Sequence, residues 1–292
     1  MTKQARFLLL FTSLLLLSSC KTTVVYQDKI DTNQPYREVP YQLFKQKKSS
    51  SKVALILPDN PDTLNIANTE VTSLLKKEGY DILVINKPGS TIQDVHSLDS
   101  REGRLADIVS VYQQEIAGQY DHFILIGIGE GAYLVPKLSH PLQSDTSIII
   151  NIGIKSPLHD YSEWVIADSL TPRQTQILHA KNIVDLDELK TRISNTWANE
   201  FGAEQLAPNT NHQWLSYAQA PFIQELFAVA KPIYWINFDG YAMISAAHRK
   251  EAALYSAHYL INYIELEGSG NLNNEEQMLL LVEKLKTIIL PR

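Results

Sequence analysis

The sequence predicts an α/β fold with a mostly parallel central sheet and helices on both of its faces. From residue 53 onward, short continuous apolar runs alternate with segments in which apolar residues recur at helical spacing. A run that is apolar at every position has no solvent-facing side, which is typical of a strand buried on both faces of a parallel sheet. The chain of 292 residues is long enough for one such domain with an insertion.

The individual elements follow from these patterns in chain order. Leu105, Ile108 and Val109 share one helical face, and Gly79 stands where the preceding helix should stop. The predicted strands are residues 53–57, 82–85, 123–126, 147–152, 233–238 and 263–266. The predicted helices are residues 66–77, 105–116, 132–138, 246–260 and 275–289.

Residues 157–221 interrupt this alternation with a polar, helical stretch. Thr171-Pro172 is a typical helix start, and Asp185 opens another helix. A connection of this length without structure of its own would be unusual, so we predict a helical insertion. A longer crossover between two strands is the alternative.

The N-terminus has the features of a signal peptide. Lys3 and Arg6 form a positively charged start, and residues 7–17 form a largely apolar run that is too short to span a bilayer as a helix. We therefore predict that residues 1–19 are a signal peptide.

Leu-Ser-Ser-Cys at residues 17–20 resembles the lipobox of bacterial lipoproteins. The resemblance implies that Cys20 is lipidated, becomes the first mature residue and anchors the protein to a membrane. Lys21 follows the cysteine where an aspartate would favour the inner membrane, so the resemblance implies the outer membrane and the periplasm. An uncleaved anchor or an ordinary buried cysteine is the alternative.

Residues 20–51 are predicted to be a flexible tether, and residues 52–292 to be the folded domain. The chain is wholly polar just before the first predicted strand, and such a stretch buries little surface. Tyr41, Leu43 and Phe44 support the alternative, an N-terminal arm packed on the domain.

The charge pattern argues against nucleic acid as a partner. The formal net charge is −6, and acidic and basic residues are mixed without a basic stripe. Gly127, Gly129 and Ala132 partly satisfy the dinucleotide-binding fingerprint, but the next strand ends at Asn151-Ile152-Gly153 without the required acidic residue. We therefore predict no cofactor.

The sequence also gives no pattern that is typical of a metal site. The eight histidines are scattered, and none is three or four residues from another. Lipidation of Cys20, the single cysteine, would leave no thiolate ligand. We therefore predict no bound metal.

Gly-Ile-Gly-Glu-Gly at residues 127–131 follows an apolar strand and resembles the Gly-x-Ser-x-Gly nucleophile elbow of α/β-hydrolases. Residues 86–90 are similar to a loop of that family, residues 231–240 to its acid-bearing strand and turn, and residues 263–271 to its histidine-bearing loop. The resemblance covers roughly residues 52–290. It implies that the insertion at 157–221 is a helical cap over the sheet.

The positions that should be catalytic in this family are degenerate. The nucleophile position is Gly129, the acid is expected near Tyr241, and the histidine is expected near Gly270 or Asn271. The loop after the first strand, which usually contributes to the oxyanion hole, contains Pro58 and Pro61, which have no N–H to donate. We expect a strained backbone at residue 129, which glycine adopts freely.

Two classes of function remain open. The first is an exported, anchored lipoprotein whose non-catalytic domain binds a small molecule or a protein. The second is an atypical esterase or hydrolase that uses other residues, such as Asp239, Glu130, Tyr241 or a histidine of the cap. The residues that could line a pocket are Asn60, Gly129, Glu130, Asp239, Tyr241 and Asn271.

Overall fold

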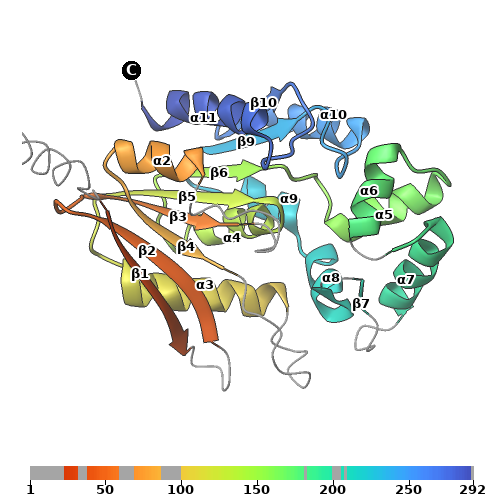
Figure 1. Cartoon of the computed structure of the whole chain (residues 1–292), viewed down its shortest axis with the longest axis horizontal. Helices are drawn as coiled ribbons and strands as arrows, with labels where there is room; N and C mark the ends of the chain where they lie inside the picture. Colours follow the sequence, from red (N-terminus) through yellow and green to blue (C-terminus); the bar gives the residue numbers. More distant parts are fainter. Residues whose placement is uncertain are drawn as a thin grey trace, which may run out of the picture.

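The computed structural model describes residues 23–31, 38–58, 69–86, 100–180, 183–198, 205–206 and 209–290. Within these residues the large sheet has eight strands in the order β1-β2-β4-β3-β5-β6-β9-β10 (Figure 1). Strands β4 to β10 of this order are parallel, whereas β2 is antiparallel to both of its neighbours. The predicted α/β fold with a mostly parallel sheet is confirmed.

The bounds of the elements are as follows. The strands are β1 (Thr23–Asp31), β2 (Glu38–Gln46), β3 (Lys52–Leu57), β4 (Asp81–Ile85), β5 (His122–Ile128), β6 (Thr146–Ile150), β7 (Gln205–Leu206), β8 (Asn209–Thr210), β9 (Ile233–Phe238) and β10 (Ile261–Leu266). The α-helices are α2 (Glu70–Lys77), α3 (Arg101–Glu115), α4 (Val135–Ser139), α5 (Pro157–Ile166), α6 (Pro172–Ala180), α7 (Leu186–Ala198), α8 (Asn211–Ala218), α9 (Phe222–Phe227), α10 (Ala246–Leu254) and α11 (Glu275–Ile289). The 3-10 helices are η2 (Gly129–Leu134) and η3 (Tyr255–Ala257).

The sheet is buried on both faces, as its continuous apolar strands predict. Along β3, Val53 and Leu55 pack into one hydrophobic cluster, whereas Ala54 and Ile56 pack into the cluster on the opposite face. Helices α3, α4 and α9 contribute to the first cluster, and α2 and α11 contribute to the second. Alternate side chains of one strand therefore contact helices on opposite faces.

The chain between β6 and β9 forms the predicted helical cap. Helices α5 to α8 lie on the side of the molecule toward which the parallel strands point (Figure 1). They share a hydrophobic cluster of their own, which includes Tyr161, Trp164, Leu189 and Trp214. A separate core allows these helices to pack as a unit over the carboxyl ends of the strands.

The flexible tether predicted for residues 20–51 is wrong, because β1 and β2 of this segment both belong to the sheet. Strand β2 belongs to the sheet and pairs with β4, and Tyr41, Leu43 and Phe44 are buried. The N-terminal arm that the sequence left open is therefore the arrangement found. Burial of these three side chains on the sheet offsets the cost of ordering the segment.

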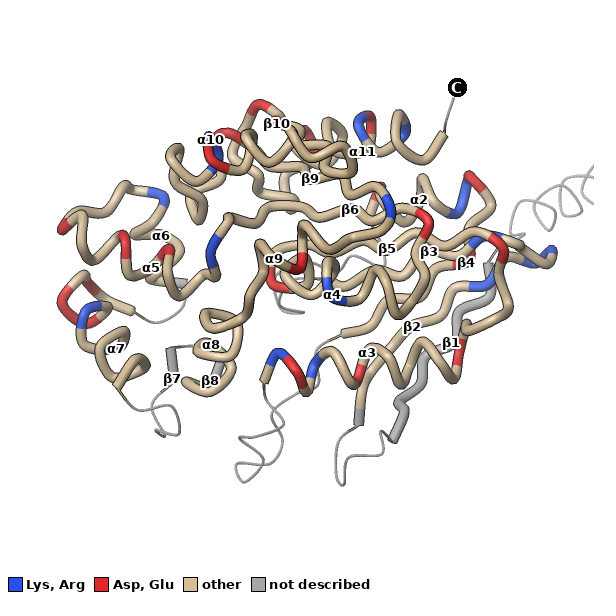
Figure 2. The backbone as a smooth tube through the Cα atoms, turned by 180° about the vertical axis from the view of Figure 1, so that it is seen from behind, with Lys and Arg blue, Asp and Glu red and all other residues tan. Residues whose placement is uncertain are grey.

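The signal peptide predicted for residues 1–19 and the lipidation site Cys20 lie outside the described residues. None of the described helices is long and apolar enough to span a bilayer. Lys and Arg residues are interspersed with Asp and Glu along the described backbone (Figure 2).

Candidate functional site

The three glycines at residues 127–131 are needed for different structural reasons. Gly129 follows β5 with a φ of +53°, so the backbone conformation expected at this residue, which favours glycine, is confirmed. A Cβ at Gly131 would lie 2.3 Å from the carbonyl oxygen of Leu57, and a Cβ at Gly127 would lie 2.5 Å from the Cα of Ala132. The outer two glycines permit close packing, whereas Gly129 permits the turn and offers no nucleophile.

The acid position, after β9, holds no buried carboxylate. Asp239 is exposed, and its Oδ1 accepts a hydrogen bond of 2.8 Å from the backbone N–H of Gly268. Tyr241 is half-buried and lies against Gly270. This hydrogen bond therefore links the turn after β9 to the turn after β10.

The histidine position, after β10, is closed to a side chain. Gly270 has a φ of +68°, and a Cβ there would lie 2.9 Å from Cδ2 of Tyr241. Its N–H donates to Oε1 of Gln277 at 3.2 Å, and its carbonyl accepts from Nδ2 of Asn151 at 3.0 Å. A histidine at this position would require the loop or the Tyr241 ring to move.

The structure brings together only some of the residues predicted to line a pocket. Tyr241 and Gly270 are in contact, and Asp239 is bound to the same loop. Asn271 uses its Oδ1 to accept from the backbone N–H of Asn273, in the turn before α11. Asn60 lies outside the described residues.

Glu130 links the elbow to the cap. Its Oε1 accepts a hydrogen bond of 2.6 Å from Nε2 of Gln213 on α8. The same helix is held to α3, because Oγ of Ser216 accepts from the backbone N–H of Arg101 at 2.8 Å. The Glu130 carboxylate thus has a partner in the cap, at the junction of η2, α3 and α8.

Asn151 is a polar residue at the strand ends that the sequence analysis did not select. It follows β6, which lies between β5 and β9, and has a φ of +57°. It is buried, and its Oδ1 accepts no hydrogen bond from the residues that the structure describes. The frequent occurrence of asparagine in left-handed turns is the sequence signal that could have identified this position.

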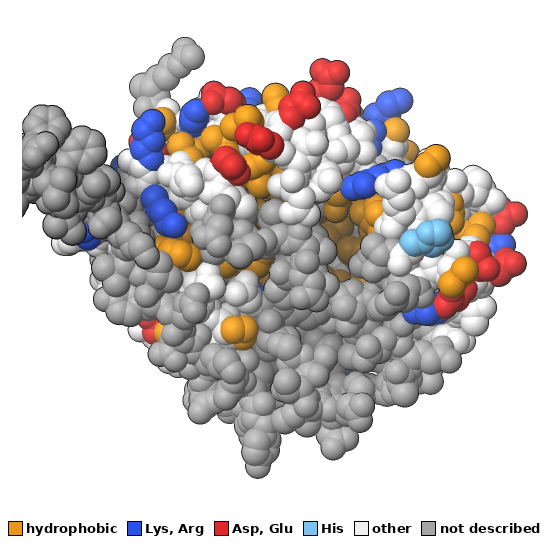
Figure 3. Space-filling model, in the orientation of Figure 1, with side chains coloured by type: hydrophobic (Ala, Val, Ile, Leu, Met, Phe, Trp, Pro, Cys, Tyr) orange, Lys and Arg blue, Asp and Glu red, His pale blue; other side chains and the backbone are white. Residues whose placement is uncertain are grey.

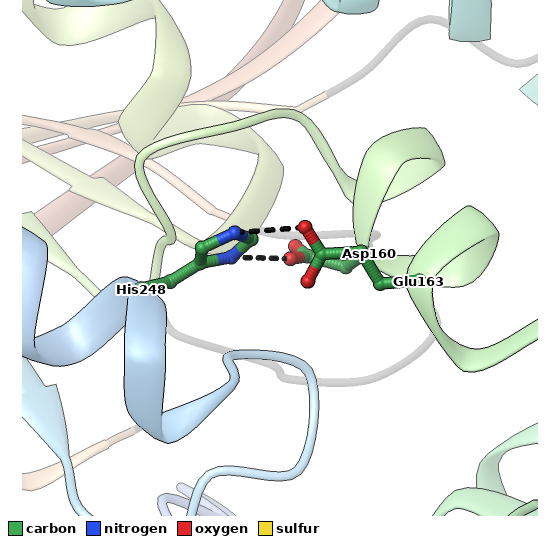
Figure 4. Close-up of side chains that lie close together, drawn as sticks. All are labelled: Asp160, Glu163 and His248. Atoms are coloured by element: carbon green, nitrogen blue, oxygen red, sulfur yellow. Dashed lines mark hydrogen bonds and ion pairs between the residues drawn. The ribbon is translucent and has the colours of Figure 1, made fainter. Parts of the chain in front are cut away.

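Among the residues that the structure describes, a group of three titratable side chains lies together between the cap and the sheet domain (Figure 4). Asp160 and Glu163 project from α5 toward the imidazole of His248, which comes from α10. Nδ1 of His248 is 3.1 Å from Oδ1 of Asp160, and Nε2 is 2.9 Å from Oε1 of Glu163. We call these three residues the junction cluster.

Burial and charge shift the pKa values in the junction cluster. Burial raises the pKa of the Asp160 carboxyl to about 7, although the hydrogen bond with His248 opposes the shift. The hydrogen bond with Asp160 raises the pKa of His248. Lys155 forms an exposed ion pair of 3.2 Å with Glu163.

Sequence reasoning missed the junction cluster because it searched for pairs of histidines close in sequence. His248 is 88 residues from Asp160, and only the packing of α10 against α5 brings them together. The available signal was the spacing of Asp160 and Glu163, since carboxylates three residues apart share one face of a helix.

A second polar pair lies at the start of α5. Oγ of Ser156 is 3.0 Å from Nδ1 of His159, and Ser156 is buried. Burial lowers the pKa of His159, so its neutral form is favoured. A hydroxyl and a neutral imidazole at this distance match two of the three groups of a catalytic triad, the nucleophile and the general base.

Figure 3 shows a recess lined by hydrophobic side chains between the sheet domain and the cap.

No protein-family model and no curated protein sequence matches the chain. Many solved structures do. A lipase in its open form has a TM-score of 0.61 and 12% identity, over 91% of this chain and 98% of that one.

Two further neighbours have the same architecture. Est1E from Butyrivibrio proteoclasticus, solved with ferulic acid, has a TM-score of 0.60 and 12% identity, over 90% of this chain and 97% of that one. Proline iminopeptidase from Mycobacterium smegmatis has a TM-score of 0.59 and 11% identity, over 90% and 98% of the two chains. The chain has the α/β-hydrolase fold, and identities this low show the fold alone.

Proposed function

We propose that this protein is an exported lipoprotein, anchored through Cys20 to the outer membrane and facing the periplasm. Its α/β-hydrolase-like domain is non-catalytic and binds a small molecule or a protein in the cell envelope. The observation that carries this proposal is Gly129, which stands with a φ of +53° at the turn where the fold presents its nucleophile.

The positions around Gly129 support a loss of catalysis. Gly270 stands at the histidine position, and the ring of Tyr241 lies where a side chain from residue 270 would begin. A triad needs a nucleophile, a base within hydrogen-bond reach and a group that orients the base. The apolar recess beside the cap supports a binding role, since ligand sites are mostly apolar with few polar groups.

The experiment is an activity assay on the full-length protein purified from detergent-solubilised membranes. Short acyl p-nitrophenyl esters are the substrates, and a fluorophosphonate is the probe for reactive serines. We expect no turnover and no labelling. Turnover that survives repurification and follows the folded protein through size exclusion would contradict the proposal.

The anchor is tested separately in cells. The native chain and a Cys20→Ala variant are grown with labelled palmitate and fractionated into membrane and soluble material. We expect label and outer-membrane location only for the native chain, because acyl chains supply the membrane affinity. Equal label or equal location in both chains would contradict the anchor, and the absence of catalysis would still be tested by the first assay.

The second candidate is an atypical hydrolase, and the Ser156–His159 pair favours it. Ser156 would attack an acyl carbonyl while His159 takes its proton. A Ser156→Ala variant tests this directly, with Ser162→Ala as the matched control on the same helix. Turnover lost in the first variant and kept in the second would support hydrolysis, whereas equal behaviour would exclude this pair.

A further inference from the structure

We propose that the junction cluster binds a divalent transition-metal ion, with Zn²⁺ as the ion whose ligand preferences fit best. One imidazole nitrogen and one oxygen from each carboxylate of Asp160 and Glu163 lie within 4.8 Å of one another. Zn²⁺ is bound in proteins by histidine nitrogen and carboxylate oxygen, with a water in the remaining position of an open site.

One nitrogen–oxygen pair of the junction cluster is close to the separation of two ligands of a single ion. The two nitrogen–oxygen pairs are separated by 2.9 and 3.1 Å. Ligand atoms about 2.0–2.2 Å from a tetrahedral Zn²⁺ lie roughly 3.3–3.6 Å apart. An ion between Nε2 of His248 and Oε1 of Glu163 therefore requires this pair to open by a few tenths of an ångström. Asp160 faces the other ring nitrogen and would have to rotate to reach the same ion.

The second nitrogen of His248 provides the support that metal-binding histidines normally have. Because both ring nitrogens face carboxylates, one can bind the ion while the other continues to donate to a carboxylate oxygen. A histidine held in this way keeps its tautomer and orientation fixed. Asp160 can thus continue to accept from Nδ1 and orient the ring, while Glu163 and water bind the ion at Nε2.

The backbone holds the three side chains in place. Asp160 and Glu163 are three residues apart on α5 and therefore share one face. The start of α10 is capped, because Oγ of Ser245 accepts from the backbone N–H of His248 at 3.2 Å. The ligands thus come from two ordered helices, and their arrangement does not depend on a loop.

The charges of the junction cluster also favour a dication. Asp160 is only 3% exposed, and burial of a carboxylate is costly unless positive charge lies beside it. A dication supplies more charge at the same place. The Glu163 side chain is 36% exposed, which leaves a route for the ion and room for water ligands. The Lys155 ammonium, 48% exposed, can turn away from Glu163 when the ion enters.

The test is a Zn²⁺ titration of the full-length protein after its metals have been removed with a chelator. Isothermal calorimetry is run in two buffers with different ionisation enthalpies. We expect one equivalent to bind with release of a proton, because ligation requires neutral His248. We also expect a higher Tm with Zn²⁺ and, with Co²⁺, the visible absorption of a tetrahedral site.

The variants are His248→Ala and Glu163→Gln, each expected to weaken Zn²⁺ binding at least tenfold. His140→Ala is the matched control, since this exposed histidine lies outside the junction cluster and should leave binding unchanged. If His248→Ala does not fold, Glu163→Gln and the Co²⁺ spectrum of the native chain decide. Equal binding by the native chain and Glu163→Gln, or no binding by the folded native chain, would overturn the proposal.

Discussion

The carboxyl edge of the sheet and the junction cluster differ in where their chemistry lies. At the sheet edge, the positions where we expected a triad hold Gly129, Tyr241 and Gly270. At the cap junction, Asp160 and His248 are buried together. A fold can therefore keep its architecture while the titratable groups gather elsewhere, which is why function must be argued from the site.

The largest effect that distinguishes the two regions is expected from His248→Ala. Removal of the imidazole leaves buried Asp160 without its partner, and breaking a buried pair costs about 3–5 kcal/mol. Because Glu163 is 36% exposed, we expect the lower part of that range, about 3 kcal/mol. Urea denaturation followed by circular dichroism measures the change.

His140→Ala is the control for this prediction, because the exposed His140 should contribute almost nothing to stability. Equal free energies of unfolding for the two variants would mean that the junction cluster does not hold the cap to the sheet domain.

At the sheet edge, the largest effect is expected from Gly131→Ala. The new Cβ would lie 2.3 Å from the carbonyl oxygen of Leu57, so the backbone of η2 or β3 must shift. Overpacking of this kind costs about 1–3 kcal/mol, and contact with backbone favours the upper part of the range. Gly153→Ala is the control, since its φ is not in the left-handed region and a Cβ there would lie 3.5 Å from its nearest neighbour, the carbonyl oxygen of Lys155. A smaller loss at Gly131 than at Gly153 would contradict the close approach.

The contribution of His248 should depend on pH. Its pKa is raised in the folded protein, so the unfolded chain loses this proton first as the pH rises. The stabilisation is complete below about pH 6.5 and is lost as the pH rises through the folded-state pKa. The raised pKa of Asp160 acts in the same direction between about pH 4 and 7.

We therefore expect the stability difference between the native chain and His248→Gln to be smaller at pH 9 than at pH 6. Urea titrations in matched buffers without divalent metal measure it. The Lys155 and His159 side chains also face the cluster, so His159→Gln serves as the background. A difference that grows with pH would show that His248 is not held as an imidazolium.

A smaller effect is expected when the missing hydroxyl is restored by Gly129→Ser. A non-glycine residue in the left-handed region costs about 1–2 kcal/mol. We expect no gain of ester hydrolysis, because Gly270 supplies no base. Gly118→Ser, at a φ of +72°, is the matched control for the backbone cost. Unchanged or increased stability of Gly129→Ser would refute the strain argument.

Local patterns predicted the sheet and the elbow, whereas contacts between distant segments escaped prediction. β5 and the turn at Gly129 were predictable because an apolar run and a glycine frame are contiguous. β2 was missed because it mixes polar and apolar residues, and its pairing with β4 is visible only in three dimensions. The helix predicted for 246–260 ends at Leu254, because the chain must turn back to begin β10 at Ile261.

At the candidate site, the sequence indicated where the strands end, and the loss of a triad there stays a prediction. The role of Glu130 could not be predicted, because its partner Gln213 belongs to a cap helix 83 residues away. The junction cluster depends on a contact of similar range.

The smallest effect tests whether Asp239, a carboxylate predicted at the sheet edge, stabilises the fold or takes part in catalysis. Asp239→Ala removes the acceptor for Gly268, and an exposed hydrogen bond contributes about 0.5–1.5 kcal/mol. We expect a loss of about 0.5 kcal/mol, near the lower end, because water can solvate the freed N–H. Asp239→Asn keeps an oxygen at Oδ1 and should restore most of it. If the protein instead hydrolyses esters through Asp239, both variants lose turnover while stability hardly changes, and the sheet edge would then be a working active site.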